Sequence, residues 1–147
     1  MIRVNAAIAH GGGPTSVLNA SLAAVIETCR RHTEIQTLQG ARSGVEGLLS
    51  ADFVDLLEID PQTVSAVAGW TGSAIGSSRR RLTEAEVERI VGIFRERDIR
   101  WFFYTGGNGS MQTALEIGRH ARAAGWDLQV IGIPKTIDND LPVTDHT

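Results

Sequence analysis

The sequence predicts an α/β fold, a parallel sheet with helices on both faces in a Rossmann-like three-layer sandwich. Short apolar runs typical of strands alternate with longer segments in which apolar residues recur at helical spacing. Clustered glycines directly follow two of the apolar runs, at residues 11–13 and 106–109. In such folds ligands bind at the carboxyl ends of the strands. Because the glycines and an acidic stretch at 134–140 all fall at predicted strand ends, we expect a ligand site there.

The first part of the chain predicts a strand, a helix and a second strand. Residues 2–10 are mostly apolar and stop at glycines, which indicates a buried strand. A helix should follow residues 14–15, because the apolar positions beyond them have helical spacing and two arginines fall in the last turn. Residues 34–40 predict the second strand. Residues 44–56 and 61–70 predict short helical or irregular pieces.

The second part of the chain contains the clearest helix start. Thr83 with Glu86 forms a capping box, and an apolar stripe follows it up to residue 98. Beyond this helix the pattern again alternates between apolar runs and helical spacing. It predicts a strand over 99–105, a helix over 111–124 and an apolar strand over 128–133.

The composition is that of an ordinary globular domain. The 147 residues carry 42% hydrophobic and 21% charged side chains with a net charge of −3, which argues against a general nucleic-acid binder. The single cysteine, Cys29, excludes an intrachain disulfide, suits a reducing compartment and is expected in the core. No apolar run approaches the ~18 residues that cross a bilayer. We therefore expect a cytoplasmic protein without nucleic-acid or membrane partners.

Two glycine-rich turns have the chemistry of a phosphate site. Gly106, Gly107 and Gly109 let backbone N–H groups converge, and Ser110 can cap the helix whose positive end then faces the turn. The alternative is an ordinary tight turn between strand and helix. The turn at residues 11–16 repeats the arrangement, so one polyphosphate could lie across both.

Three consecutive arginines, residues 79–81, precede the Thr83 cap. Positive charge at a helix N-terminus opposes the helix dipole and costs roughly tenths of a kcal/mol. A solvated basic edge is one interpretation. The other is that one of the three arginines reaches a transferred phosphate, whose oxygens its planar donor fork fits.

The acidic stretch carries two carboxylates and an ammonium. An extended loop would place Asp138 and Asp140 on the same side. One carboxylate could accept a proton from an attacking hydroxyl while the other helps to hold a divalent cation, and Lys135 could supply positive charge to phosphate oxygens. A plain turn is the alternative, because Asp, Asn and Pro favour turns.

Together these motifs resemble the phosphofructokinase family, and most of all its branch that includes pyrophosphate-dependent members. The resemblance implies transfer of a phosphoryl group from ATP or pyrophosphate to the C1 hydroxyl of fructose 6-phosphate, in glycolysis, with Mg²⁺. The motifs that carry it span nearly the whole chain, at 11–27, 40–49, 72–83, 104–111 and 132–147.

The resemblance also implies roles for individual residues. Asp138 matches the family's catalytic base, and Thr136 and Asp140 match residues around the reacting end of the sugar phosphate and the metal. Lys135 stands beside them as a further catalytic candidate. The donor-phosphate arginine corresponds to Arg79, and the donor cradle corresponds to Gly12, Gly107, Asn108, Gly109 and Ser110. At Asn108 many members of the family carry an acidic metal ligand, so Asn108 and Asp140 are the metal candidates.

The nature of the donor rests on two positions that disagree. Similar pyrophosphate enzymes usually carry Asp where this chain has Gly109 and Lys where it has Lys135, whereas ATP enzymes carry Gly at both. A side chain at 109 would block the α-phosphate region of a nucleotide, and an ammonium at 135 would bind pyrophosphate. Since ATP requires the open pocket while a lysine merely coexists with it, we lean slightly to ATP.

Family members are more than twice as long as this chain. We therefore expect residues 1–147 to be the N-terminal, donor-binding domain of a longer two-domain protein that forms a homo-oligomer. The sugar-binding half is absent, so a kinase for another sugar phosphate such as sedoheptulose 7-phosphate stays open. A non-catalytic nucleotide- or phosphate-binding regulatory domain is the other alternative, although pure binding needs no base such as Asp138.

Overall fold

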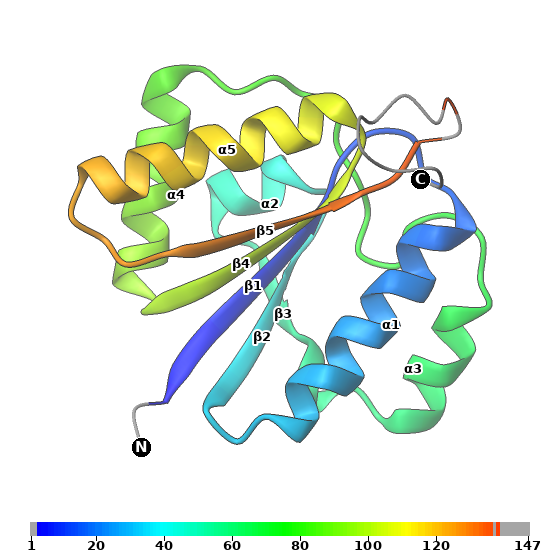
Figure 1. Cartoon of the computed structure of the whole chain (residues 1–147). Helices are drawn as coiled ribbons and strands as arrows, with labels where there is room; N and C mark the ends of the chain where they lie inside the picture. Colours follow the sequence, from blue (N-terminus) through cyan, green and yellow to red (C-terminus); the bar gives the residue numbers. More distant parts are fainter. Residues whose placement is uncertain (1–2, 137, 139–147) are drawn as a thin grey trace.

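In the computed structural model, which describes residues 3–136 and Asp138, the chain forms a five-stranded sheet of order β3-β2-β1-β4-β5 (Figure 1). All neighbouring strands run parallel except β3, which pairs antiparallel with β2. The strands are β1 (Val4–His10), β2 (Ile35–Ala41), β3 (Phe53–Asp55), β4 (Ile99–Gly106) and β5 (Gln129–Pro134).

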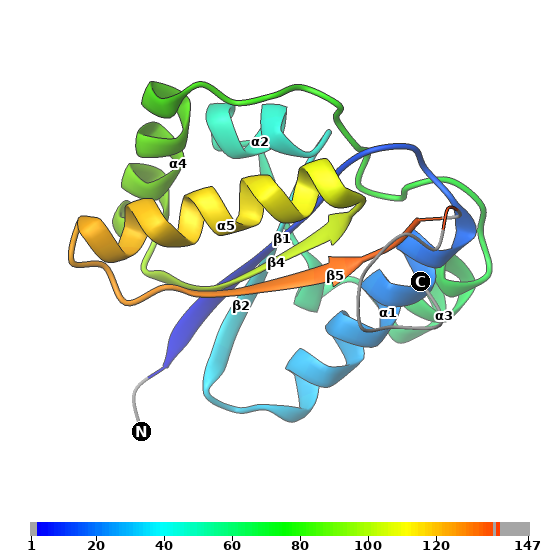
Figure 2. The ribbon, with the colours of Figure 1, turned by 45° about the horizontal axis from the view of Figure 1, so that its top comes forward.

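Helices cover both faces of this sheet, which confirms the predicted three-layer α/β fold. Figures 1 and 2 show α1 and α3 on one side and α2, α4 and α5 on the other. The helices are α1 (Ser16–Arg31), α2 (Val45–Ser50), α3 (Pro61–Ala68), α4 (Glu84–Glu96) and α5 (Asn108–Ala123), with a short 3-10 turn, η1 (Leu56–Glu58), between β3 and α3.

The alternation of side chains along β1 divides the core into two halves. Ala7 and Ala9 belong to the half formed with α2, α4 and α5, in which the rings of Phe94 and Phe102 lie 5.1 Å apart. Ala6 and Ile8 point to the half formed with α1 and α3. Because β1 is buried on both faces, it reads as a continuous apolar run rather than an alternating one.

Cys29 lies in the α1 half of the core, as predicted, and is 3% exposed. Burial raises the pKa of its thiol to about 11. Since the thiolate is the nucleophilic form, this cysteine has the character of a packing residue.

The region between β2 and α4 differs most from the expectation. Residues 44–56 contain α2 and then β3, an edge strand that the sequence did not predict. β3 spans three residues, too few for a periodic pattern, and it forms because Val54 and Phe53 meet Gly40 and Ala41 of β2. The segment 61–70 contains α3, which is capped by Asp60, the residue before it, through the N–H of Thr63.

No helix in the described part of the chain is long and apolar enough to cross a membrane.

Candidate functional site

The order of the strands reverses between β1 and β4. The connection through α1 carries the chain from β1 to β2 on one side, whereas α5 leads from β4 to β5 on the other. Loops that leave two neighbouring parallel strands in opposite directions open a crevice at the strand ends, where α/β proteins bind ligands. The two glycine turns lie at this point. We call residues 11–13 the first glycine loop and residues 106–109 the second.

The two glycine loops are in direct contact. The N–H of Gly11 donates to the carbonyl of Thr105 across 2.8 Å. A Cβ atom added to Gly11 would lie 2.1 Å from the hydroxyl of Ser110, and one added to Gly106 would lie 2.3 Å from the same hydroxyl. Only glycine therefore fits at both positions while Ser110 occupies the space between the loops.

Ser110 is a spacer between the loops and not a helix cap, so the capping prediction is wrong. The N-cap of α5 is Gly107, without a side-chain hydrogen bond, because Asn108 and Gly109 are already helical. Ser110 consequently falls within the first turn of α5. There its buried hydroxyl is hydrogen-bonded with the phenol of Tyr104, whose pKa is raised by burial.

A cleft of about 490 Å³ opens beside the two loops. The start of α5 faces it, so the N–H groups of its first turn and the positive end of its dipole are available to an anion. Asn108 and Gly109 are exposed, and nothing lies within 4 Å of a Cβ added to Gly109. The lining residues are Gly12, Ser78, Arg79, Arg80, Arg81, Leu82, Tyr104, Gly107, Gly109, Ser110, Gln112, Thr113 and Glu116.

The segment before the arginines is fastened to the first glycine loop. Gly12 donates its N–H to the carbonyl of Ser78 across 3.0 Å, and the hydroxyl of Ser77 donates to the carbonyl of Gly12 across 2.7 Å. Gly11 and Ser78 also form an isolated parallel bridge. Sequence reasoning did not assign a role to these two serines. The signals for them were their place between Gly76 and the arginines and their inclusion in the motif at 72–83.

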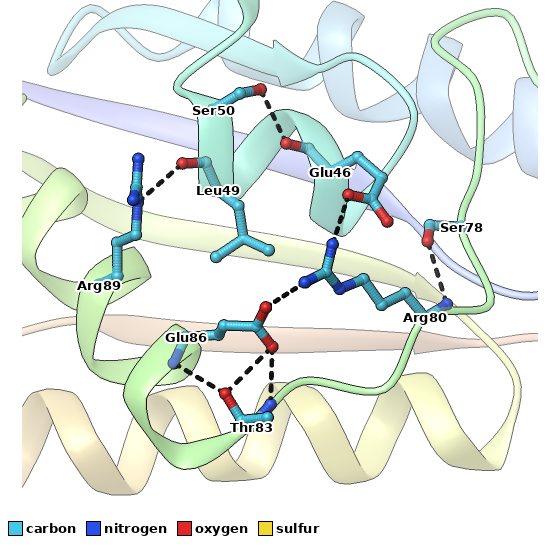
Figure 3. Close-up of polar contacts among 8 residues, drawn as sticks. All are labelled: Glu46, Leu49, Ser50, Ser78, Arg80, Thr83, Glu86 and Arg89. Carbon is cyan, nitrogen blue, oxygen red and sulfur yellow. Dashed lines mark hydrogen bonds and ion pairs between the residues drawn. The ribbon is translucent and has the colours of Figure 1, made fainter.

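The structure distinguishes two of the three arginines. A guanidinium nitrogen of Arg79 lies 3.0 Å from the position of a Cβ on Gly13, so this side chain extends over the first glycine loop. Arg80 instead forms ion pairs with Glu46, at 2.9 Å, and with Glu86 (Figure 3). Those carboxylates raise the pKa of Arg80. Arg80 therefore joins α2 to the start of α4, whereas Arg79 lies over the first glycine loop.

The ion pair with Glu86 also offsets the unfavourable positive charge of the arginines before the N-terminus of α4. Thr83 and Glu86 form the predicted capping box: the N–H of Glu86 donates to the Thr83 hydroxyl at 3.3 Å, and the N–H of Thr83 donates to the Glu86 carboxylate at 2.9 Å (Figure 3). The carboxylate that completes the cap thus also neutralises the nearby arginine.

Thr83→Ala should lower the free energy of unfolding by about 1 kcal/mol, because it leaves an N–H group of the first turn without its acceptor. Urea denaturation measures the loss. Thr83→Ser keeps the hydroxyl and is the matched control, expected within a few tenths of a kcal/mol of the parent. Equal losses in both variants would mean that the methyl group of Thr83, and not the cap, carries the effect.

Lys135 connects the two glycine loops from the end of β5. Its backbone N–H donates to the carbonyl of Gly106 across 3.0 Å, while its ammonium donates to the carbonyl of Gly13. The same ammonium lies 3.9 Å from the position of a Cβ on Gly12. A positive charge therefore stands between the loops, beside the N–H groups of the first turn of α5, which already favour an anion.

The acidic residues follow directly on this lysine. Thr136 is half-buried, and its hydroxyl accepts a hydrogen bond from the N–H of Asp138 at 3.1 Å. This bond forms a turn that leaves Asp138 exposed. Asp140, the predicted metal-side carboxylate, lies outside the described residues.

The structure thus brings together most of the residues predicted for the donor: Gly12, Gly107, Gly109, Ser110, Arg79 and Lys135. Among residues 3–136 and Asp138, no three His, Cys, Asp or Glu side chains gather in a way that could hold a metal ion. Mg²⁺ in phosphate-transfer sites is usually held by one or two carboxylates together with substrate phosphates, and a preformed protein cage is not required. The amide of Asn108 at the start of α5 is compatible with such a partial ligand set.

A sheet whose switch point carries two glycine loops, an arginine and a lysine has the features of an α/β domain with a phosphate site. The chain belongs to the phosphofructokinase family: the family model described as Phosphofructokinase matches residues 5–147.

Relatives with both kinds of donor match the chain. The pyrophosphate–fructose 6-phosphate 1-phosphotransferase of Halomonas elongata is 39% identical over 153 residues, covering 100% of this chain and 36% of the relative. An ATP-dependent 6-phosphofructokinase of Amycolatopsis methanolica is 34% identical over 145 residues, covering 99% of this chain and 31% of the relative. A crystal structure of pyrophosphate-dependent phosphofructokinase from Nitrosospira multiformis superimposes with a TM-score of 0.91 at 39% identity, over 96% of this chain and 36% of that chain.

This chain therefore spans about 36% of the length of the first of these relatives. The higher identities belong to proteins named for pyrophosphate, which argues against the slight preference for ATP drawn from Gly109.

Proposed function

We propose that the protein containing this chain is a pyrophosphate-dependent 6-phosphofructokinase, which transfers a phosphoryl group to the C1 hydroxyl of fructose 6-phosphate and yields fructose 1,6-bisphosphate and phosphate. The observation that carries the proposal is the position of Lys135, bonded to the carbonyls of Gly13 and Gly106 at the meeting of the two glycine loops. The pyrophosphate-dependent relatives support it.

Lys135 and Arg79 suit a small polyanion because they approach the same loop from different elements. The arginine lies over Gly13, and the ammonium reaches the carbonyl of that residue. A pyrophosphate held by the N–H groups at the start of α5, beside the first glycine loop, would receive one cation from each of these two elements. Charge spread over the transferred group would be stabilised in the same way.

The acceptor chemistry falls to the turn after Lys135. In this proposal Asp138 takes the proton from the C1 hydroxyl as its oxygen bonds to phosphorus and the bond to the leaving phosphate breaks. Thr136 fixes the turn through the N–H of Asp138. Asn108 and Asp140 would hold Mg²⁺ together with donor oxygens, and the ion would supply positive charge to the phosphates. The sugar site and the homo-oligomeric state depend on chain beyond these residues.

ATP is the second candidate donor, and one observation favours it. The cleft continues past Gly109 along α5 to Gln112, Thr113 and Glu116, and it encloses about 490 Å³. A Cβ at Gly109 would meet nothing within 4 Å, so the entry to that part of the cleft is open. A nucleotide needs this space, whereas pyrophosphate does not.

A donor comparison on the protein that contains this chain tests the proposal. With fructose 6-phosphate as acceptor, we expect turnover with pyrophosphate to exceed turnover with ATP, and sedoheptulose 7-phosphate serves as the competing acceptor. Turnover with ATP alone would make ATP the donor, and donor binding without turnover would support the regulatory domain.

Gly109→Asp is expected to leave the KM for pyrophosphate within a few-fold and to raise any KM for ATP about tenfold or more. The side chain would enter the part of the cleft that only a nucleotide fills, where its carboxylate would block the α-phosphate and repel it by about 1 to 4 kcal/mol. Initial rates over a donor series measure both constants. Gly109→Ala is the control for volume without charge. A variant that kept its use of ATP intact would show that position 109 does not select the donor.

A further inference from the structure

His10, the last residue of β1, is a fully buried polar side chain next to the first glycine loop. Its Nδ1 atom lies 2.7 Å from the hydroxyl of Ser73. The only proton of that hydroxyl is directed to the carbonyl of Gly76, 2.9 Å away. Ser73 therefore accepts a hydrogen bond from His10, which places the imidazole proton on Nδ1.

This tautomer leaves the other ring nitrogen without a partner. Nε2 of His10 is buried and has no hydrogen bond within the described residues. Burying an acceptor in this state costs about 1 to 3 kcal/mol. An apolar side chain at this position would avoid the cost, so the imidazole is explained by what its Nδ1–H holds.

The hydrogen bond of His10 reaches the segment that carries the arginines. From Ser73 the chain turns through Gly76, at a φ of +76°, where a Cβ would lie 2.9 Å from the backbone nitrogen of Ser43. It then pairs with the first glycine loop at Ser77 and Ser78. Residues 73–78, which we call the serine loop, are thus attached to the end of β1 at both ends.

Arg79 comes directly after the serine loop and lies over Gly13. The position of its guanidinium is therefore set by the way in which the serine loop lies on residues 10–12. Arg80, the next residue, is fixed separately by Glu46 and Glu86, so the chain around Arg79 is held from both sides.

We propose that His10 is a positioning residue for the phosphate donor: its Nδ1–H, through Ser73, holds the serine loop on the first glycine loop and so aims Arg79 at the donor. The inference rests on the proposed function only for the statement that Arg79 contacts a donor phosphate.

Two amide substitutions separate this role from simple packing. The amide nitrogen of Asn has nearly the place of Nδ1 in histidine, whereas that of Gln has the place of Nε2. In the protein that contains this chain, His10→Asn should keep the dissociation constant for pyrophosphate within about threefold, because it retains the donor to Ser73. His10→Gln and Ser73→Ala should each weaken binding about tenfold, a loss of 1.4 kcal/mol. Isothermal titration calorimetry with pyrophosphate measures all three, and circular dichroism verifies the fold.

Arg79→Gln distinguishes failure of this inference from failure of the proposed function. If Arg79→Gln binds pyrophosphate like the parent, or the parent does not bind it, the proposed donor site is wrong. If Arg79→Gln loses affinity and His10→Gln does not, His10 has no positioning role. We expect His10→Gln to cause no further loss in the Arg79→Gln background, since its effect passes through that arginine. Additive losses would overturn the proposal.

A spectroscopic measurement tests the hydrogen bond without a donor. Nitrogen-15 shifts of the His10 ring in the donor-free protein should show a protonated Nδ1 and an unprotonated Nε2. The side-chain N–H resonance of Arg79 should shift in His10→Gln and remain in place in His10→Asn. A ring protonated at Nε2 would contradict the proposal, and so would an Arg79 resonance that shifts in neither variant.

Discussion

Asp138→Asn is expected to lower kcat by about 10² to 10⁴-fold in the protein that contains this chain, the usual contribution of a positioned general base. Asp138 is exposed in a turn that the Thr136 hydroxyl stabilises through its backbone N–H. The asparagine keeps this backbone bond and the size of the side chain but cannot take up the proton. Because the substitution leaves Arg79, Lys135 and the glycine loops unchanged, the affinity for pyrophosphate should stay within a few-fold. Stopped-time assays of fructose 1,6-bisphosphate and calorimetry of the donor measure the two effects.

Asp138→Glu is the control for this experiment. It keeps a carboxylate but displaces it by one methylene group, so its turnover should lie between those of the parent and of Asp138→Asn. Unchanged turnover in Asp138→Asn would remove this residue from the chemistry. Turnover absent from the parent as well as the variant, with donor binding intact, would favour a binding domain.

The features that the sequence predicted correctly are those that local chemistry decides. The capping box of Thr83 and Glu86 involves groups within one helical turn, and β1 is an apolar run because both of its faces are covered. β4 is mostly apolar as well, although Trp101 is 37% exposed. The carboxyl ends of these strands were located by the glycines that follow them. No long-range contact is needed to recognise any of these.

The features that were missed depend on residues far apart in the chain. β3 exists only through its pairing with β2, and the hydroxyl of Ser110 fills the space that Gly11 and Gly106 leave between the two loops. The role of His10 follows from Ser73, 63 positions away. A sequence lists such residues without showing that the fold makes them neighbours.

The three adjacent arginines, residues 79–81, combine a feature that the sequence indicated with one that depends on distant residues. The sequence indicated that one of them would serve a phosphate, and the resemblance pointed to Arg79. Arg80 is instead paired with Glu46, 34 positions before it, and with Glu86 in the capping box (Figure 3). Once Arg80 bridges α2 and α4, its neighbour Arg79 extends over the first glycine loop. Under the proposed function, donor binding falls to Arg79 and the link between α2 and α4 falls to Arg80.

The conformational stability of this domain is expected to fall by about 3 kcal/mol between pH 7 and pH 4 through His10 alone. Burial lowers the pKa of His10 from 6.5 to about 4 in the folded state. Between these pH values His10 is therefore protonated in the unfolded chain and neutral in the folded chain. The stability that the neutral ring contributes is fully present above pH 6.5, the pKa of histidine in the unfolded chain. It is lost as the pH falls from about 6.5 to about 4. Ser73 and Thr105, the hydrogen-bond partner and the β4 neighbour of His10, do not titrate in this range.

His10→Asn isolates this effect, because it keeps the hydrogen bond to Ser73 and cannot be protonated. Urea denaturation at several pH values should show a stability of the variant that falls less steeply between pH 6.5 and 4 than that of the parent. Three carboxylates, Glu34, Asp60 and Glu86, also have lowered pKa values, so their protonation at lower pH reduces stability. This reduction is the same in both proteins and cancels in the difference between them. Parallel pH profiles would show that the folded protein accepts a proton on His10. In that case the neutral Nδ1–H tautomer that holds the serine loop would give way to an imidazolium before the protein unfolds.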